Sequence, residues 1–172
     1  IDGANDSATI SGNSSAHLAE DGNASATGHL AVADVDAGQA HVQASTVVTD
    51  QGTFAIGTDG NWSFAVNSAD PSVQALGAGD SMTKSFTVTS ADGTATQTVS
   101  VTIDGANDSA TISGNSSAHL AEDGNASASG HLAVADVDAG QAHVQASTVV
   151  TDQGTFAIGT DGNWSFAVNS AD

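Results

Sequence analysis

The feature that most constrains the fold is a long internal repeat. Residues 103–172 repeat residues 1–70 with a single change, Thr27 to Ser129. The offset of 102 residues is much longer than the roughly 20–50 residues of a solenoid repeat. Each copy is therefore expected to be a domain with its own core rather than one layer of a stack.

The repeat also predicts the domain boundaries. We expect a complete domain over residues 1–102, a linker at about 103–108 and a partial second repeat over 103–172. The second copy has no counterpart of residues 71–102, which read as its last two strands. Its sheet edges and core face would then be open, so we expect it to be poorly stable unless strands come from another molecule.

Within one copy, apolar residues alternate with a period of two, which predicts strands. Alternating runs flank Asp59-Gly60 and Asp92-Gly93, and Asp-Gly between such runs is a strong hairpin signal. The only helix-like stretch is residues 71–77, with Pro71 in the first turn and Gly77 as a stop. About seven short strands in about 100 residues fit an all-β, Ig-like β-sandwich.

The same alternation predicts the core. Trp62 alternates with Phe64 and Val66, so it is expected to be a core anchor rather than a platform for a sugar. The core is also expected to contain residues of the second hairpin, namely Phe86, Val88, Val99, Val101 and Ile103.

Charge and composition exclude several classes of function. The chain has 20 acidic residues against one Lys or Arg, and a formal net charge of −19. Nucleic-acid binding needs clustered basic side chains, and an anionic membrane surface would repel the chain. No apolar run reaches the roughly 20 residues that span a bilayer. The absence of cysteine excludes disulfides, thiolate zinc sites and cysteine nucleophiles.

The acids gather in three short strings per repeat, which lie at predicted strand ends or in linkers. Their acidic and amide members are Asp2, Asn5 and Asp6; Glu20 and Asp21; and Asp34 and Asp36. Calcium takes six to eight oxygens from carboxylates, amides and backbone carbonyls at short spacings. The strings therefore predict calcium sites, although Asp, Asn and Gly also build plain turns. Plain turns are the favoured interpretation for Asp50, Asp59, Asp80 and Asp92.

The run VTIDGANDSATISG, LAEDG, GHLAVADVDAG and GTFAIGTDGNWSFAVNSAD resembles the VCBS repeat. That repeat occurs in tandem in very large bacterial adhesins of the RTX type, and the near-identity of the copies resembles the extender repeats of ice-binding adhesins. The resemblance implies a Greek-key sandwich, Ig-like or cadherin-like, with several Ca²⁺ ions per repeat. It also implies type I secretion to the outer surface of a bacterium.

The resemblance also implies roles for individual residues. Asp104, Asn107 and Asp108 match a cadherin linker that holds calcium between domains, and Asp136 and Asp138 match the Asp-x-Asp that closes such a site. The start of the first copy has the same pattern, with Asp2, Asn5 and Asp6 followed by Asp34 and Asp36. The full set of candidate calcium ligands is Asp2, Asn5, Asp6, Glu20, Asp21, Asp34, Asp36, Asp104, Asn107, Asp108, Glu122, Asp123, Asp136 and Asp138.

The predicted function is mechanical. Calcium would stiffen the junctions of a spacer that projects a distal domain, with neighbouring identical repeats of the same chain as partners. An adhesive module that binds a glycan or protein directly is the alternative. Direct ice binding is not expected, because no short-period threonine array occurs. An enzyme is not expected either, because HExxH and GxSxG are absent and His17, His29 and His41 are spaced by 12, which suggests one histidine per strand.

Overall fold

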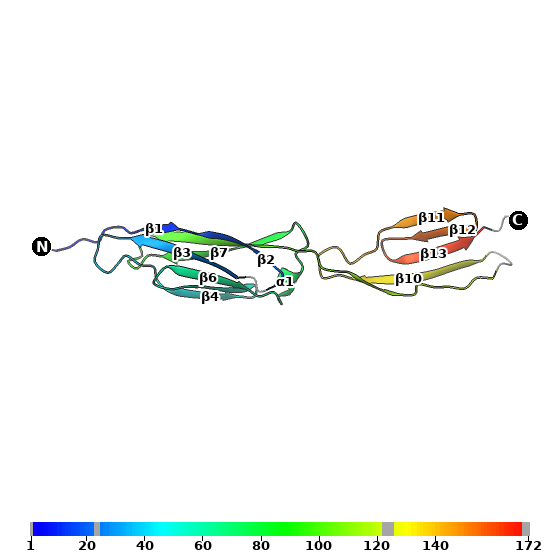
Figure 1. The fold of residues 1–172 in the computed structure, drawn as a ribbon, viewed down its shortest axis with the longest axis horizontal. Helices are drawn as coiled ribbons and strands as arrows, with labels where there is room; N and C mark the ends of the chain where they lie inside the picture. Colours follow the sequence, from blue (N-terminus) through cyan, green and yellow to red (C-terminus); the bar gives the residue numbers. More distant parts are fainter. Residues whose placement is uncertain (1, 23–24, 122–125, 170–172) are drawn as a thin grey trace. The chain divides into compact units, whose positions relative to one another are not determined.

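The protein, as a computed structural model, is described for residues 2–22, 25–121 and 126–169. It divides into two units, residues 1–107 and 108–172, called unit 1 and unit 2 below (Figure 1). The division falls inside the predicted linker. Residues 103 and 104 are not linker, however, because the last strand of unit 1 continues to Asp104.

Unit 1 is an all-β sandwich of two sheets, as the period of two predicts. The larger sheet has the order β1-β3-β6-β5-β4 and the smaller has the order β2-β8-β7. The larger sheet is formed by β1 (Thr9–Gly12), β3 (Ser25–Ala33), β4 (Ser45–Thr49), β5 (Gly52–Ile56) and β6 (Asn61–Val66). The smaller sheet is formed by β2 (Ser15–Ala19), β7 (Ser81–Thr89) and β8 (Thr96–Asp104).

The strand order is that of a Greek key. Strands β4, β5 and β6 follow one another through antiparallel pairings, and β6 returns to lie beside β3. In the smaller sheet β2 runs parallel to β8, which places Ala19 opposite Asp104. Both Asp-Gly hairpins are confirmed, as the β5-β6 and β7-β8 pairs.

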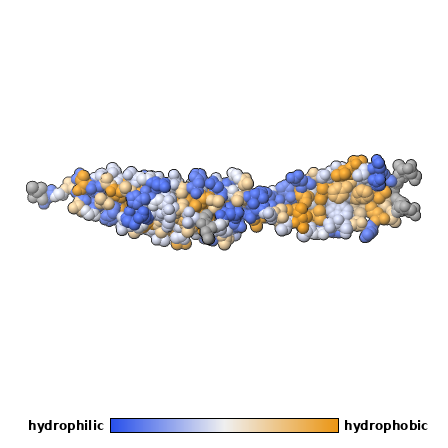
Figure 2. Space-filling model, in the orientation of Figure 1, coloured by the Kyte–Doolittle hydropathy of each residue, from blue (hydrophilic) through white to orange (hydrophobic). Residues whose placement is uncertain are grey.

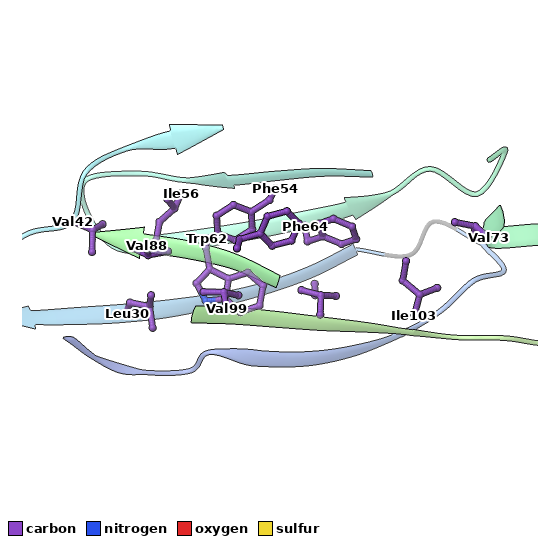
Figure 3. Packing of buried hydrophobic residues seen from close by; sticks show 13 residues of the cluster. Leu30, Val42, Phe54, Ile56, Trp62, Phe64, Val73, Val88, Val99 and Ile103 are labelled. Carbon is purple, nitrogen blue, oxygen red and sulfur yellow. The ribbon is translucent and has the colours of Figure 1, made fainter. Parts of the chain in front are cut away.

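The core lies between the two sheets (Figure 3). The ring of Phe86, from the smaller sheet, stacks on that of Phe54 at a centroid distance of 4.4 Å and tilts against that of Phe64 at 5.5 Å. The predicted anchor Trp62 is 2% exposed. The other predicted core residues, Val88, Val99, Val101 and Ile103, are buried as well.

Trp62 is held by both its polar and its apolar atoms. Its Nε1 donates a hydrogen bond to the backbone oxygen of Asn13 at 2.8 Å. Its ring lies over Gly28, where an added Cβ would come within 2.5 Å of ring atoms. This fit explains why a buried tryptophan is opposed by a residue without a side chain, and it supports the core role of Trp62.

The predicted helix is α1 (Pro71–Gln74), with Pro71 in its first turn. Asp70 caps it, since its Oδ1 accepts a hydrogen bond from the backbone nitrogen of Ser72 at 2.9 Å. Over the described residues, no helix has the length and apolar character needed to cross a membrane.

Unit 2 repeats the larger sheet. Its strands have the order β11-β12-β13-β10-β9. They are β9 (Thr111–Gly114), β10 (Ser127–Ala135), β11 (Ser147–Thr151), β12 (Gly154–Ile158) and β13 (Asn163–Val168). Its described residues contain no counterpart of β7 or β8.

A third strand is also missing from the described part of unit 2, which the sequence did not predict. Residues 117–121 have the same sequence as β2 but form no strand. In unit 1 the residues of β2 pair with β8. Without a counterpart of β8, residues 117–121 have no strand of that kind to pair with.

The β5-β6 turn predicts a low pKa that can be measured directly. Asp59 accepts hydrogen bonds from the side chain and backbone nitrogen of Asn61, at 2.6 and 3.1 Å. The side-chain bond is the main reason why the pKa of Asp59 lies below its ordinary value of 3.8. Ionised Asp59 therefore contributes stability above about pH 4 that is lost as the pH falls toward the lowered pKa. Asn61→Ala is expected to raise the pKa of Asp59 toward 3.8, as measured by carboxyl NMR.

Unit 2 supplies an internal control for this measurement. Asp161 accepts the same two hydrogen bonds from Asn163 and its pKa is lowered for the same reason. In the Asn61→Ala protein the pKa of Asp161 should stay low. A pKa of Asp59 that did not move would show that the Asn61 side chain is not the cause.

Candidate metal centre

An acidic cluster lies at the end of unit 1 where β3 finishes. Asp34 and Asp36 follow the last residue of β3, and Asp6 belongs to the irregular segment before β1. The backbone nitrogen of Asp6 donates to Oδ2 of Asp36 at 2.7 Å, and that of Asp36 donates to Oδ1 of Asp34 at 2.8 Å. The backbone of Asp6 is thus brought to the carboxylate of Asp36, 30 positions away, while Asp34 and Asp36 are two positions apart. We call Asp6, Asp34 and Asp36 the acidic trio of unit 1.

One carboxylate oxygen of this trio lacks a hydrogen-bond partner. Among the described residues, Oδ2 of Asp34 is buried without a hydrogen-bond partner. A buried carboxylate oxygen with no donor is costly, and coordination of a metal ion is a common way in which such groups are satisfied. Carboxylate oxygens are donors of the kind that calcium takes.

Asn5 joins the trio to the β7-β8 turn. Its Nδ2 donates to the backbone oxygen of Asp6 at 2.9 Å and to Oδ2 of Asp92 at 3.0 Å. Hydrogen bonds from Ser90, then Thr94, then Asn5 hold the pKa of Asp92 well below its ordinary range. The interpretation of Asp92 as a turn residue agrees with these bonds, which come mostly from its own hairpin.

The sequence did not predict that Asp92 lies beside Asn5. The hairpin prediction already placed the β7-β8 turn, with Asp92, at the end of unit 1 opposite Asp104, because β8 runs from Thr96 to Asp104. It could not predict the contact with Asn5, because the sequence does not show that the segment before β1 lies at that same end. Asp2 is exposed in that segment.

Unit 2 builds the same trio from the second copy. The backbone nitrogen of Asp108 donates to Oδ2 of Asp138 at 2.9 Å, and that of Asp138 donates to Oδ1 of Asp136 at 3.0 Å. Asp138 is 2% exposed, and in the described part of the chain its Oδ1 is buried without a hydrogen-bond partner. The two hydrogen bonds are therefore a property of the repeat, whereas the buried oxygen without a partner is on Asp34 in unit 1 and on Asp138, the counterpart of Asp36, in unit 2.

Glu20 and Asp104 lie together at the other end of unit 1. Glu20 directly follows β2, and its backbone nitrogen donates to the oxygen of Asp104 at 3.0 Å. Oε1 of Glu20 accepts from the backbone nitrogen of Ala106 at 3.3 Å, and the residue is fully buried. The glutamate thus fixes the start of the linker. His17 Nδ1 lies 3.1 Å from Oδ2 of Asp104 at this end.

Four further residues were predicted as ligands. Asp21 is exposed beside the buried Glu20, as expected for adjacent residues that point in opposite directions. Asn107 is exposed at the unit boundary. Glu122 and Asp123 lie outside the described residues.

The predicted placement of one histidine in each strand can be compared with the strands of unit 1. His17 lies in β2 and His29 in β3, but His41 lies outside the strands, so the spacing of 12 does not put one histidine in each strand. Nε2 of His29 lies 3.1 Å from the backbone oxygen of Asp59, and unit 2 repeats this contact. The contact ties β3 to the β5-β6 turn.

Comparison with known proteins decides the family. The family model of the bacterial cadherin-like domain matches residues 5–105. The chain belongs to the bacterial cadherin-like domain family. Cadherin-like domains are typically structural or adhesion modules rather than enzymes, and they generally bind calcium. A search of curated proteins finds no match.

Solved structures of similar fold are cadherins. Extracellular cadherin domains 1–4 of protocadherin gamma B7 match with a TM-score of 0.53 and 17% identity, over 96% of this chain and 42% of that one. Domains 1–4 of protocadherin gamma B3 match with a TM-score of 0.49 and 14% identity, over 96% and 41%. The chain thus spans about two fifths of these structures. The first of these similarities agrees with the cadherin-like sandwich fold.

Proposed function

We propose that this bacterial cadherin-like chain is a calcium-stabilised extender repeat of a large secreted adhesin. The observation that carries the proposal is the acidic trio, which both units build with the same hydrogen bonds. Among the described residues, a buried carboxylate oxygen without a hydrogen-bond partner belongs to Asp34 in unit 1 and to Asp138, the counterpart of Asp36, in unit 2. Such a chain would act outside a bacterial cell, and secretion by a type I system fits the resemblance to RTX adhesins.

Calcium would supply positive charge and coordination at these oxygens. The chain itself supplies the preorganised part of the site. The backbone nitrogens of Asp6 and Asp108 orient one carboxylate of each trio, and the Asx-type bonds to Asp34 and Asp136 orient the next. Without a cation the carboxylates of a trio repel one another, so calcium binding would convert a destabilising cluster into a stabilising one.

The proposed spacer role follows from where the acidic groups lie. Unit 1 has the trio at one end and Glu20 with Asp104 at the other, next to the linker. We propose that residues 107 and 108, beyond the part of the linker that Glu20 holds, bend freely without calcium and become stiff when calcium is shared between linker and following repeat. Neighbouring identical repeats of the same chain would be the partners, and no binding of nucleic acid, membrane or ice is part of this function.

The test is a melt of the full chain by calorimetry, in excess calcium and then in EDTA. A site filled 100-fold above its dissociation constant adds about 2.7 kcal/mol to the free energy of unfolding. Calcium is therefore expected to raise the Tm by roughly 10–20 °C for each site filled to this extent, because about 1 kcal/mol corresponds to roughly 4–8 °C in a domain of this size.

Paired variants assign the effect to the trios. Asp34→Asn with Asp136→Asn should remove most of the calcium-dependent rise. The matched control, Asp50→Asn with Asp152→Asn, removes the same two charges at exposed positions outside both trios. An equal Tm in calcium and EDTA, or an equal loss in both double variants, would refute the trios as calcium sites. Small-angle scattering of the parent tests the spacer role, which requires a larger maximum dimension in calcium.

A further inference from the structure

Strand β4 is an exposed edge of the larger sheet of unit 1. It is the last strand in the order β1-β3-β6-β5-β4, and it lies at the border of unit 1 in Figure 1. Val48 is 75% exposed and Val47 is 40% exposed. In an antiparallel pair every second residue bonds to the neighbouring strand, so the residues between them direct N–H and C=O groups outward when the strand is an edge. β4 therefore offers both backbone hydrogen-bonding groups and apolar side chains to a partner strand.

This edge lacks the features by which proteins commonly protect an edge strand, namely charged side chains, proline and bulges. Residues 42–49 include no charged residue and no proline. β4 and β5 pair without interruption from Ser45 opposite Ile56 to Thr49 opposite Gly52. By contrast, the edge strand β7 of the smaller sheet carries Lys84, the chain's only lysine. The two sheets of unit 1 thus differ in how their edges are protected.

The same edge recurs in unit 2. Strand β11 has the sequence of β4, is the last strand of its sheet and pairs with β12 in the same register. Val149 is 50% exposed and Val150 is 72% exposed. β4 is exposed in a unit that has both of its sheets, so the open edge belongs to the complete domain.

We propose that β4 pairs in antiparallel direction with β4 or β11 of a second copy of this chain. A two-fold axis makes such an edge its own complement. Directly opposite residues share a face of the sheet, so full overlap of the five residues places Val47 opposite Val47. It also places Thr46 opposite Val48 and Ser45 opposite Thr49. Main-chain hydrogen bonds give the affinity, as in other strand-addition complexes.

Charge and repetition favour a second copy as the partner. Each copy has a net charge of −19, but no charged residue lies in the paired segment. Charges farther apart than about 8 Å are largely screened at physiological ionic strength. Each copy also carries the edge twice, so one contact raises the effective concentration for the next. Figure 2 shows hydrophilic and hydrophobic residues interspersed over the drawn face of unit 1, which favours contact through the strand edge.

The experiment is sedimentation velocity of the full 172-residue chain in excess calcium, from micromolar to millimolar protein. A five-residue edge is much smaller than a standard interface of roughly 1,600 Å², so we expect a weak dimer whose fraction rises with protein concentration. Sodium chloride is expected to increase the dimer fraction, because it screens the repulsion between copies and the contact contains no ion pair.

Paired variants assign the contact to the edge. Val48→Lys with Val150→Lys should weaken the dimer at least about ten-fold, because it sets like charges at both edges. The control, Ala65→Lys with Ala167→Lys, adds the same two charges at exposed positions of the inner strands β6 and β13. It should leave the Kd unchanged. Circular dichroism of both double variants shows that the sheets are intact.

A crosslink tests the register. The chain has no cysteine, so an introduced thiol has no other partner in one copy than its own counterpart. Opposite residues of an antiparallel pair have Cβ atoms roughly 4.5–5.5 Å apart. Val47→Cys with Val149→Cys should therefore give a disulfide-linked dimer in dissolved oxygen, and Ala65→Cys with Ala167→Cys should give far less.

Three results would overturn the proposal. The first is a parent chain that stays monomeric at every protein and salt concentration. The second is association that persists in the Val48→Lys, Val150→Lys protein, which would place the contact elsewhere. The third is an equal loss in the Ala65→Lys, Ala167→Lys protein, which would indicate contact through the sheet face or a general effect of charge.

Discussion

Phe54→Ala is expected to destabilise unit 1 by about 3–5 kcal/mol, the usual cost of truncating a buried phenylalanine. Phe54 is 1% exposed, stacks on Phe86 at 4.4 Å and lies 6.2 Å from the ring of Trp62. The sheets on both sides of this contact restrict collapse into the cavity, which places the cost at the upper part of that range. Urea unfolding followed by tryptophan fluorescence measures it.

The chain offers a matched control for this substitution. Both Phe54→Ala and Phe156→Ala are made in a Trp164→Phe background, so that Trp62 is the only tryptophan and reports unit 1 alone. Phe156→Ala removes the same atoms from unit 2 and should leave the Trp62 transition within about 0.5 kcal/mol of its parent. A loss below about 1 kcal/mol for Phe54→Ala would contradict the packing of this core.

Gly60→Ala is expected to destabilise unit 1 by about 2–4 kcal/mol, from two separate causes. Gly60 has φ of +78°, where a side chain costs about 1–2 kcal/mol. An added Cβ would also come within 1.9 Å of the backbone oxygen of Leu30. The two backbones cannot separate easily, because the nitrogen of Leu30 donates to the oxygen of Gly60 at 2.9 Å. Urea unfolding of the two proteins gives the difference.

Gly93→Ala separates these causes. Gly93 holds the same place in the other Asp-Gly hairpin with φ of +79°, but nothing lies within 4 Å of an added Cβ. Its substitution should cost only the conformational part, about 1–2 kcal/mol. Equal losses at Gly60 and Gly93 would show that the contact with Leu30 has no energetic effect.

Much of the fold could be predicted because its signals are local. Asp-Gly between alternating runs predicts both hairpins, and the alternation itself places Trp62 and Phe86 in the core. The parallel pairing of β2 with β8 could not be predicted in this way, since it joins residues about 85 positions apart without a turn signal. The sequence therefore predicted two missing strands in the second copy, where residues 108–121 and 126–169 lack three.

The candidate site could likewise be predicted only where its residues are close together in the sequence. Asp34 and Asp36 lie within a single turn, so their spacing alone predicts that they act together. Asp6 was predicted from its own acidic string, and the family resemblance implied that it acts with Asp34 and Asp36; the structure shows its contact with Asp36 across 30 positions. Asp92 was assigned to its hairpin, and its second contact, with Asn5, depends on the path of the first segment. Whether calcium binds stays a prediction.

The sequence by itself determined the class of strand structure, the hairpins, the core-facing residues and the acidic strings, because each depends on residues close together along the chain. Only the tertiary structure decided whether a given segment forms a strand and whether a given apolar side chain is buried. The segment Ser-Ala-His-Leu-Ala is a strand at residues 15–19 and none at 117–121, and phenylalanine is buried at position 54 and half-exposed at 156. The physical reason is that a strand needs a partner for its backbone hydrogen bonds and an apolar face needs a second layer, and in this chain the β7-β8 hairpin provides both.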